Sequence, residues 1–223
     1  MPPFQHVIAD PAALAELYRE PTDLVQQKKR AGIDPGSARF IGLSPFVLIA
    51  TVGADGGVDV SPRGGAPGFV RVHHADPDHG DGADYILLPD LNGNNLIDTL
   101  RAVVATGAAG LLFVVPGKDE TLRLNGPAWV VTDAAVLDRF DEVRRPKAAI
   151  AVRADEVFVH CAKAFRRGRV WEPDAWAELA AAPDLAELVC ESGLVPGGNP
   201  ELIRADLAEG YARELAEDRP AHA

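Results

Sequence analysis

Three short stretches of the chain combine polar side chains with glycines between apolar runs. They are residues 61–65 (SPRGG), 88–95 (LPDLNGNN) and 120–126 (ETLRLNG). In the first, Arg63 can pair with an anion, and Gly64 and Gly65 let the backbone approach a ligand. In the second, we expect Asn94 and Asn95 to open a helix, whose free N–H groups and dipole favour a phosphate. Taken singly, the same residues also fit a surface turn and an ordinary helix cap.

Other chemistries have weaker support. The signatures GxGxxG, Walker lysine, HExxH and CxxC are absent from the sequence, which disfavours the common nucleotide and metal sites. Ser61 and His160 permit a hydrolytic triad by residue count, but Ser61 lacks the GxSxG context of such nucleophiles. Cys161 follows His160 at a strand end, where neighbours point to opposite faces, so we expect a buried structural cysteine rather than a catalytic thiolate.

One polar loop has the residue types of a metal site. Imidazoles and carboxylates are ligands for transition metals, although a solvated acidic loop is the favoured interpretation. The residues concerned are His73, His74, Asp76, Asp78 and His79.

The composition narrows the functional class. The 223 residues include 22 Lys and Arg against 33 Asp and Glu, a formal net charge of −11, which argues against nucleic-acid or anionic-membrane partners. A hydrophobic content of 47% is typical of a folded globular chain. Two cysteines are too few for a disulfide framework, and no window resembles a signal peptide or a membrane span. We therefore expect a cytoplasmic protein.

Short β-rich runs separated by turns must position these polar stretches. The pattern predicts strands at 46–52, 58–61, 69–72, 85–88, 110–115, 120–124, 128–132, 148–152 and 156–160. Asn125-Gly126 predicts a hairpin turn between two of them, and an amphipathic helix follows Asn95 and ends before Gly107. Further helices are expected from Asp10, around 22–29, at 133–143 and from Pro173 onward, with Asn199 capping the last. The fold class is mainly β with peripheral α, an antiparallel barrel.

The ordered stretches resemble a known family. The runs FVLIATVGADGGVDVSPRGG, YILLPDLNGNNLIDTLRAVV, GLLFVVPGKDETLRLNG and VFVHCAKAFRRGRVW are similar to those of the pyridoxamine 5′-phosphate oxidase-like proteins, the FMN-binding split barrels, and specifically to a bacterial branch of unassigned function. The resemblance covers about residues 40–171. It divides the chain into an N-terminal helical extension (1–39), a split-barrel domain (40–172) and a C-terminal helical extension packed on the barrel (173–223).

The resemblance implies a split β-barrel homodimer with FMN in each of two clefts between the subunits. Residues 61–65 would face the flavin ring and ribityl chain, the 89–95 stretch would lie on the phosphate side, Thr121 and Arg123 would reach across the interface, and the last strand would close the pocket. The implied cofactor-binding residues are Ser61, Pro62, Arg63, Gly64, Gly65, Pro89, Asp90, Asn94, Asn95, Thr121, Arg123, His160, Cys161 and Lys163.

Two departures from the family pattern shape the expected function. Many members carry Arg-Lys where this chain has Asn94-Asn95, so Arg63, Arg123 or Lys163 must neutralise the phosphate. The tail FRRGRVW lacks the histidine of the substrate-phosphate motif, so oxidation of pyridoxamine phosphate is not expected. We expect an FMN-dependent oxidoreductase acting on a small organic substrate. The alternatives are a flavin-storing protein without turnover and a split barrel that binds deazaflavin or haem.

Overall fold

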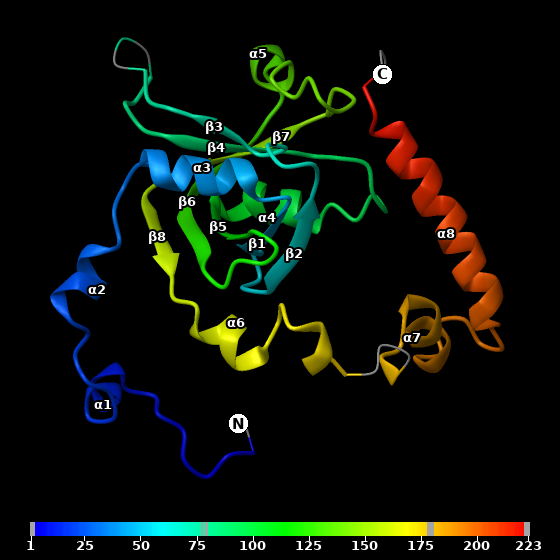
Figure 1. The fold of residues 1–223 in the computed structure, drawn as a ribbon, viewed down its shortest axis with the longest axis horizontal. Coiled ribbons are helices and arrows are strands. Elements are labelled where there is room, and N and C mark those ends of the chain that lie inside the picture. The colour runs from blue at the N-terminus through cyan, green and yellow to red at the C-terminus, as the bar shows by residue number, and fades with distance from the viewer. Residues whose placement is uncertain (1–2, 77, 79, 178–180, 221–223) are drawn as a thin grey trace.

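The fold is an open antiparallel barrel with helices around it. The computed structural model describes residues 3–76, 78, 80–177 and 181–220. Its eight-stranded sheet has the order β2-β1-β5-β6-β7-β4-β3, with β8 also paired to β6, and its ladders are antiparallel. The sheet curls without closing (Figure 1), which confirms the expected split barrel. The strands are β1 (Phe46–Val52), β2 (Val58–Gly64), β3 (Arg71–His73), β4 (Tyr85–Pro89), β5 (Ala108–Val114), β6 (Thr121–Val131), β7 (Ala149–Arg153) and β8 (Glu156–His160).

Helices precede, interrupt and follow the sheet. Figure 1 shows α3 crossing one end of the barrel and α8 standing along one side. None of the described helices is both long and apolar enough to cross a bilayer. The helices are α1 (Pro11–Ala15), α2 (Asp23–Gln27), α3 (Pro35–Leu43), α4 (Asp98–Thr106), α5 (Ala134–Leu137), α6 (Lys163–Gly168), the 3₁₀ turn η1 (Pro173–Ala175), α7 (Leu185–Glu191) and α8 (Pro200–Glu217).

Period-two alternation divides the sheet into an inner and an outer face. In β1, Val47 and Ile49 are fully buried, whereas Leu48 on the other face is half-buried. The inner face packs with Ile41 of α3 and Val103 of α4, and burying such side chains is the main favourable term in folding. The outer face carries apolar side chains as well, among them the half-buried Leu48 and the exposed Val60.

The predicted hairpin turn at Asn125-Gly126 is wrong, because β6 continues through both residues. Residues 121–125 of β6 pair with β8 and residues 128–131 pair with β7, while β5 pairs with residues 121–127. A Cβ on Gly126 would lie 1.9 Å from the Arg153 carbonyl oxygen. The glycine is therefore required by the close approach of another strand, a use that the dipeptide alone does not distinguish from a turn.

Three other boundaries differ from expectation. The central helix α4 begins at Asp98, three residues after Asn95, and β3 begins at Arg71 rather than at residue 69. Helix α3, which the sequence pattern did not predict, is capped by Asp34, whose side chain accepts from Gly36 N and Ser37 N. Helix α3 therefore crosses the expected boundary between the N-terminal extension, which ends at residue 39, and the split-barrel domain, which begins at residue 40.

The predicted terminal helices are confirmed. Asp10 accepts a hydrogen bond from Ala12 N at the start of α1, and Asn199 accepts one from Glu201 N at the start of α8. Both caps supply an acceptor to a helix amide that would otherwise lack one. Part of the C-terminal extension, residues 178–180 and 221–223, lies outside the described residues.

Candidate functional site

The SPRGG stretch begins inside β2 and aligns three polar side chains on the inner face. Asp59, Ser61 and Arg63 alternate with Val60 and Pro62, which are exposed. Their partners across the β1 ladder are Thr51, Ile49 and Val47, all buried on the inner face. Strand alternation thus directs a polar row under the sheet, towards α4.

The row converges on Thr99 in the first turn of α4, a residue only 2% exposed. Thr99 Oγ1 lies 3.1 Å from Arg63 Nη2, 2.9 Å from Asp59 Oδ2 and 3.1 Å from Ser61 Oγ. Ser61 also donates to Asp59 Oδ2 at 3.0 Å. The sequence analysis did not identify Thr99 or Asp59 as site residues. The available signal was the position of Thr99, in the run DTL shortly after the predicted start of the helix.

Asp90 adds a carboxyl group to this cluster. Burial raises its pKa above the ordinary value, while the nearby cations Arg63 and Lys147 act in the opposite direction. Desolvation disfavours the ionised form of a carboxyl group. The cluster therefore combines the cation Arg63 with the carboxyl groups of Asp59 and Asp90, and burial disfavours the ionised form of Asp90.

Asn94 and Asn95 do not open α4, which corrects the expected phosphate position. Asn94 Oδ1 accepts from Leu96 N at 2.9 Å, and Asn95 has a left-handed backbone with φ of 58°. The N-cap of α4 is Ile97, and it makes no side-chain capping bond. First-turn amide donors thus lie beside Thr99 and Arg63, and Asp98 in the same turn pairs with Arg101 at 3.2 Å.

The glycines and prolines of the predicted site have structural roles. A Cβ on Gly65 would lie 2.6 Å from the side chain of Phe69, so core packing already requires this glycine. On Gly64 it would lie 3.5 Å from the Pro45 carbonyl oxygen, an ordinary contact. Pro89 is buried at the end of β4, opposite Ala149, and Pro62 points to the outer face.

A second polar group occupies the outer face of β6 and β8. Arg123 Nη2 lies 3.3 Å from Glu156 Oε1, and its guanidinium carbon lies 4.2 Å from the centre of the Phe158 ring. Asn125 Nδ2 donates to the same carboxylate at 2.8 Å, and Lys29 Nζ approaches Glu156 Oε2 at 3.1 Å. Hydrogen bonds from Lys29, Asn125 and Arg123 hold the pKa of Glu156 below its usual range despite partial burial.

One donor of this group lacks a hydrogen-bond partner, and an imidazole lies close to it. The buried Arg123 Nε has no hydrogen-bond partner among the described residues. Burial, and then the charge of Arg123, lower the pKa of His160, whose ring packs 4.7 Å from that of Phe158. A cavity of about 310 Å³ borders Arg123 and His160 and extends over Leu48 and Val60.

The two polar groups lie on opposite faces of the sheet. Arg123 pairs with Leu112, Leu112 with Leu48 and Leu48 with Pro62, so Arg123 shares its face with Pro62 and not with Arg63. Within the chain the structure therefore brings Ser61, Arg63 and Asp90 together but keeps them apart from Arg123 and His160.

The remaining predicted residues lie near the end of β8. Thr121 is buried at the start of β6, opposite His160. Cys161 follows β8 and is exposed, so the expectation of a buried cysteine is wrong. Lys163 begins α6 and is also exposed.

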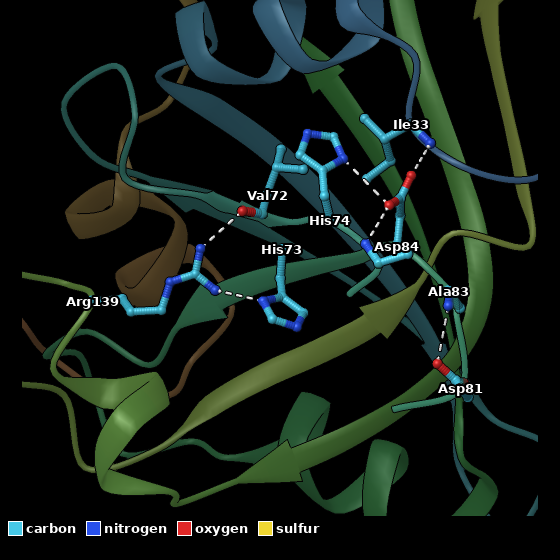
Figure 2. A network of polar contacts seen from close by, with 9 residues as sticks. Ile33, Val72, His73, His74, Asp81, Ala83, Asp84 and Arg139 are labelled. Atoms are coloured by element: carbon cyan, nitrogen blue, oxygen red, sulfur yellow. Dashed lines mark hydrogen bonds and ion pairs between the residues drawn. The ribbon is translucent and has the colours of Figure 1, made fainter. Parts of the chain in front are cut away.

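The polar loop between β3 and β4 is held by structural hydrogen bonds. Asp84 accepts from Ile33 N at 2.6 Å and lies 3.3 Å from His74 Nδ1 (Figure 2). It also accepts from Ala75 N at 2.9 Å. Although burial acts the other way, these contacts lower the pKa of Asp84. Arg139 binds His73 Nδ1 and the Val72 carbonyl oxygen.

This loop was the candidate metal site. Among the residues that the structure describes, no group of three or more His, Cys, Asp or Glu side chains is arranged to hold a metal ion. His79 of this loop lies outside the described residues.

The open antiparallel sheet, with the polar cluster between β2 and the start of α4, has the architecture of a split-barrel protein. The sequence profile of pyridoxamine 5′-phosphate oxidase matches residues 33–161, more than half of the chain. The chain therefore belongs to the pyridoxamine 5′-phosphate oxidase family. No curated protein matches it.

Solved structures similar to this chain have low identity. HupZ of Group A Streptococcus is 17% identical with a TM-score of 0.43, over 57% of this chain and 93% of that one. A candidate pyridoxamine 5′-phosphate oxidase of Lactobacillus delbrueckii is 18% identical with a TM-score of 0.42, over 59% and 98%. An F420 reductase is 16% identical with a TM-score of 0.35, over 57% and 98%.

Proposed function

We propose that the protein is an FMN-dependent oxidoreductase that acts on a small organic substrate, with the flavin bound at a homodimer interface. The observation that carries this proposal is the contact between Arg63 and Thr99 at the uncapped start of α4. A guanidinium, two hydroxyl groups and first-turn amides form a donor set suited to a phosphate. These residues fit the phosphate of FMN.

The chain's own groups would bind and orient the cofactor. Arg63 would donate to the phosphate, and the Ser61 and Thr99 hydroxyls would turn from Asp59 towards it. Burial disfavours the ionised form of Asp90, which would limit its repulsion of the phosphate. FMN, when bound, supplies the hydride and electron chemistry.

The outer face of β1, β2 and β5 supports the dimer. Val58 and Val60 of β2 are exposed and Leu48 and Leu112 are half-buried on the same face. An apolar sheet face of this kind is stabilised by packing on a second sheet, and a two-fold dimer offers the same face of a second copy. Such a dimer would bring Arg123 and His160 of the partner subunit towards the cleft beside β2.

Two narrower expectations belong to the same proposal. The protein would reside in the cytoplasm, where the free Cys161 and Cys190 would remain reduced. Pyridoxamine phosphate would not be its substrate, because the tail FRRGRVW lacks the histidine of the substrate-phosphate motif.

A flavin titration tests the phosphate site. Arg63→Ala should weaken FMN binding about tenfold to a hundredfold, because a hydrogen bond to a charged group contributes about 1.5–3 kcal/mol. Flavin fluorescence during reconstitution measures the affinity, and circular dichroism checks that the variant folds. Arg145→Ala, which removes an exposed arginine paired with Asp138, is the matched control and should bind FMN normally.

The identity of the bound ligand tests the cofactor class. Mass spectrometry of the ligand released from purified protein should give FMN, and NAD(P)H should bleach its visible absorption. A bound flavin that no electron donor reduces would indicate a storage protein without turnover. Haem or a deazaflavin as the released ligand would contradict the proposal, as would equal FMN affinity in Arg63→Ala and the unaltered protein.

A further inference from the structure

The N-terminal arm, residues 3–28, presents apolar side chains to solvent. Phe4 and Tyr18 are each 72% exposed, Leu24 is 71% exposed, and neither α1 nor α2 has a buried residue. Helices of five residues do not persist in water by themselves. The arm therefore needs an apolar surface to cover it.

The arm has few ties to its own barrel. The hydrogen bonds described for residues 3–28 link residues within that segment, apart from one that the Gln26 carbonyl oxygen accepts from Lys29 N. Beyond it, Arg30 pairs with Val157 through backbone bonds of 3.2 and 2.7 Å at the edge of β8. A cavity of about 490 Å³ separates α2 from β8, with Leu24 and Val159 among its lining residues. Figure 1 shows the arm extending from this edge away from the sheet.

At the opposite edge of the sheet, α8 leaves an apolar groove. A cavity of about 830 Å³, the α8 groove, lies between α8 and the end of β2 and is lined by Pro62, Leu185, Leu207, Tyr211 and Leu215 among others. Leu215 is 68% exposed, and α8 has no buried residue. Asn92 holds the C-terminal end of α8, because its Nδ2 donates to Glu217 Oε2 at 2.9 Å and its backbone N donates to Asp218 Oδ1 at 3.1 Å. The groove lies along the middle of the helix, before these contacts.

The proposed dimer places these two surfaces together. If β6 and β8 of one subunit face β2 of its partner, the arm leaves β8 beside the partner's β2 edge, where Pro62 borders the α8 groove. We propose that the N-terminal arm of each subunit docks in the α8 groove of the other. This inference rests on the dimer of the proposed function. It pairs two surfaces that are apolar and uncovered within one subunit, and two-fold symmetry forms the contact twice.

Photo-crosslinking tests the contact directly. With p-benzoylphenylalanine in place of Tyr18, irradiation of the full-length protein should give covalent dimers linked to residues 203–215. Links within one chain, or no links, in a sample that light scattering shows to be dimeric would overturn the arm contact and leave the dimer standing. A monomer by light scattering would overturn both.

Proteolysis gives a second measurement. Leu17→Asp should speed tryptic cleavage at Arg19 in the dimer by about tenfold to a hundredfold, because it removes one buried leucine from the docked arm. Leu43→Asp replaces a similarly exposed leucine at the end of α3 and should leave this rate unchanged. Rapid cleavage at Arg19 in the unaltered protein, with no further effect of Leu17→Asp, would contradict docking.

Discussion

At the scale of single residues, the balance of charge around Arg63 controls the candidate phosphate site. Asp90 lies near Arg63 and Lys147, and burial raises its pKa. A carboxyl group whose folded pKa is raised destabilises the fold once the pH exceeds the unfolded value, because the unfolded chain then releases its proton more readily. Removal of this carboxyl group should therefore affect both stability and anion binding.

Asp90→Asn should raise the midpoint of thermal unfolding at about pH 7, and the gain should vanish below about pH 4, where both states hold the proton. The same variant should bind FMN more tightly, because it removes a potential negative charge near Arg63. Calorimetry and flavin titration measure the two effects. Asp141→Asn, an exposed carboxylate paired with Arg71, is the control for flavin binding. Weaker FMN binding in Asp90→Asn would show that the carboxyl group holds the ligand instead.

His160 makes stability depend on pH in the opposite sense. Burial and Arg123 lower its pKa from the ordinary 6.5, so the unfolded state binds more protons as the pH falls through that value. Stability should be lost on acidification, and His160→Gln should reduce the loss between about pH 7.5 and pH 5.5. An unchanged pH profile of thermal unfolding in His160→Gln would exclude this contribution.

At the scale of secondary structure, Gly126 allows β6 to exchange one partner strand for another. Its added Cβ would meet the backbone of Arg153 at 1.9 Å, and backbone cannot rotate away as a side chain can. Gly126→Ala should destabilise the protein by about 1–3 kcal/mol, the usual cost of overpacking. Gly42→Ala in α3 meets nothing within 4 Å and should be neutral or stabilise by up to about 1 kcal/mol. Denaturant unfolding measures the free energy of unfolding of both variants. Equal stabilities would contradict the close approach of Arg153 to Gly126.

Local patterns predicted most strands because their cause is local. The run FVLIATV alternates between the two faces of β1, and turn residues bound it. One of the missed boundaries depends on a distant residue, and the other on the conformation of a short loop. Gly126 is required by Arg153, and the start of α4 is decided by the loop conformation at Asn94 and Asn95.

At the scale of the whole molecule, the open face of the sheet should form the dimer. Val60→Asp places a charge at a side chain that is 57% exposed on this face, so the fold should survive while the dimer dissociates and FMN affinity falls. Val104→Asp, at a 75% exposed position on α4, should have neither effect. Light scattering measures the mass in each case. A dimer that persists in Val60→Asp would place the interface elsewhere.

The sequence by itself determined the family and the antiparallel class, because ordered motifs and alternating apolar residues are properties of short segments. Only the tertiary structure assigned Arg63 and Arg123 to opposite faces, joined Thr99 to Ser61 and Asp59, and exposed Cys161. These contacts and faces are set by the register of the strands and by the packing of α4 under β2. Because they involve residues far apart in the sequence, a local sequence pattern cannot predict them.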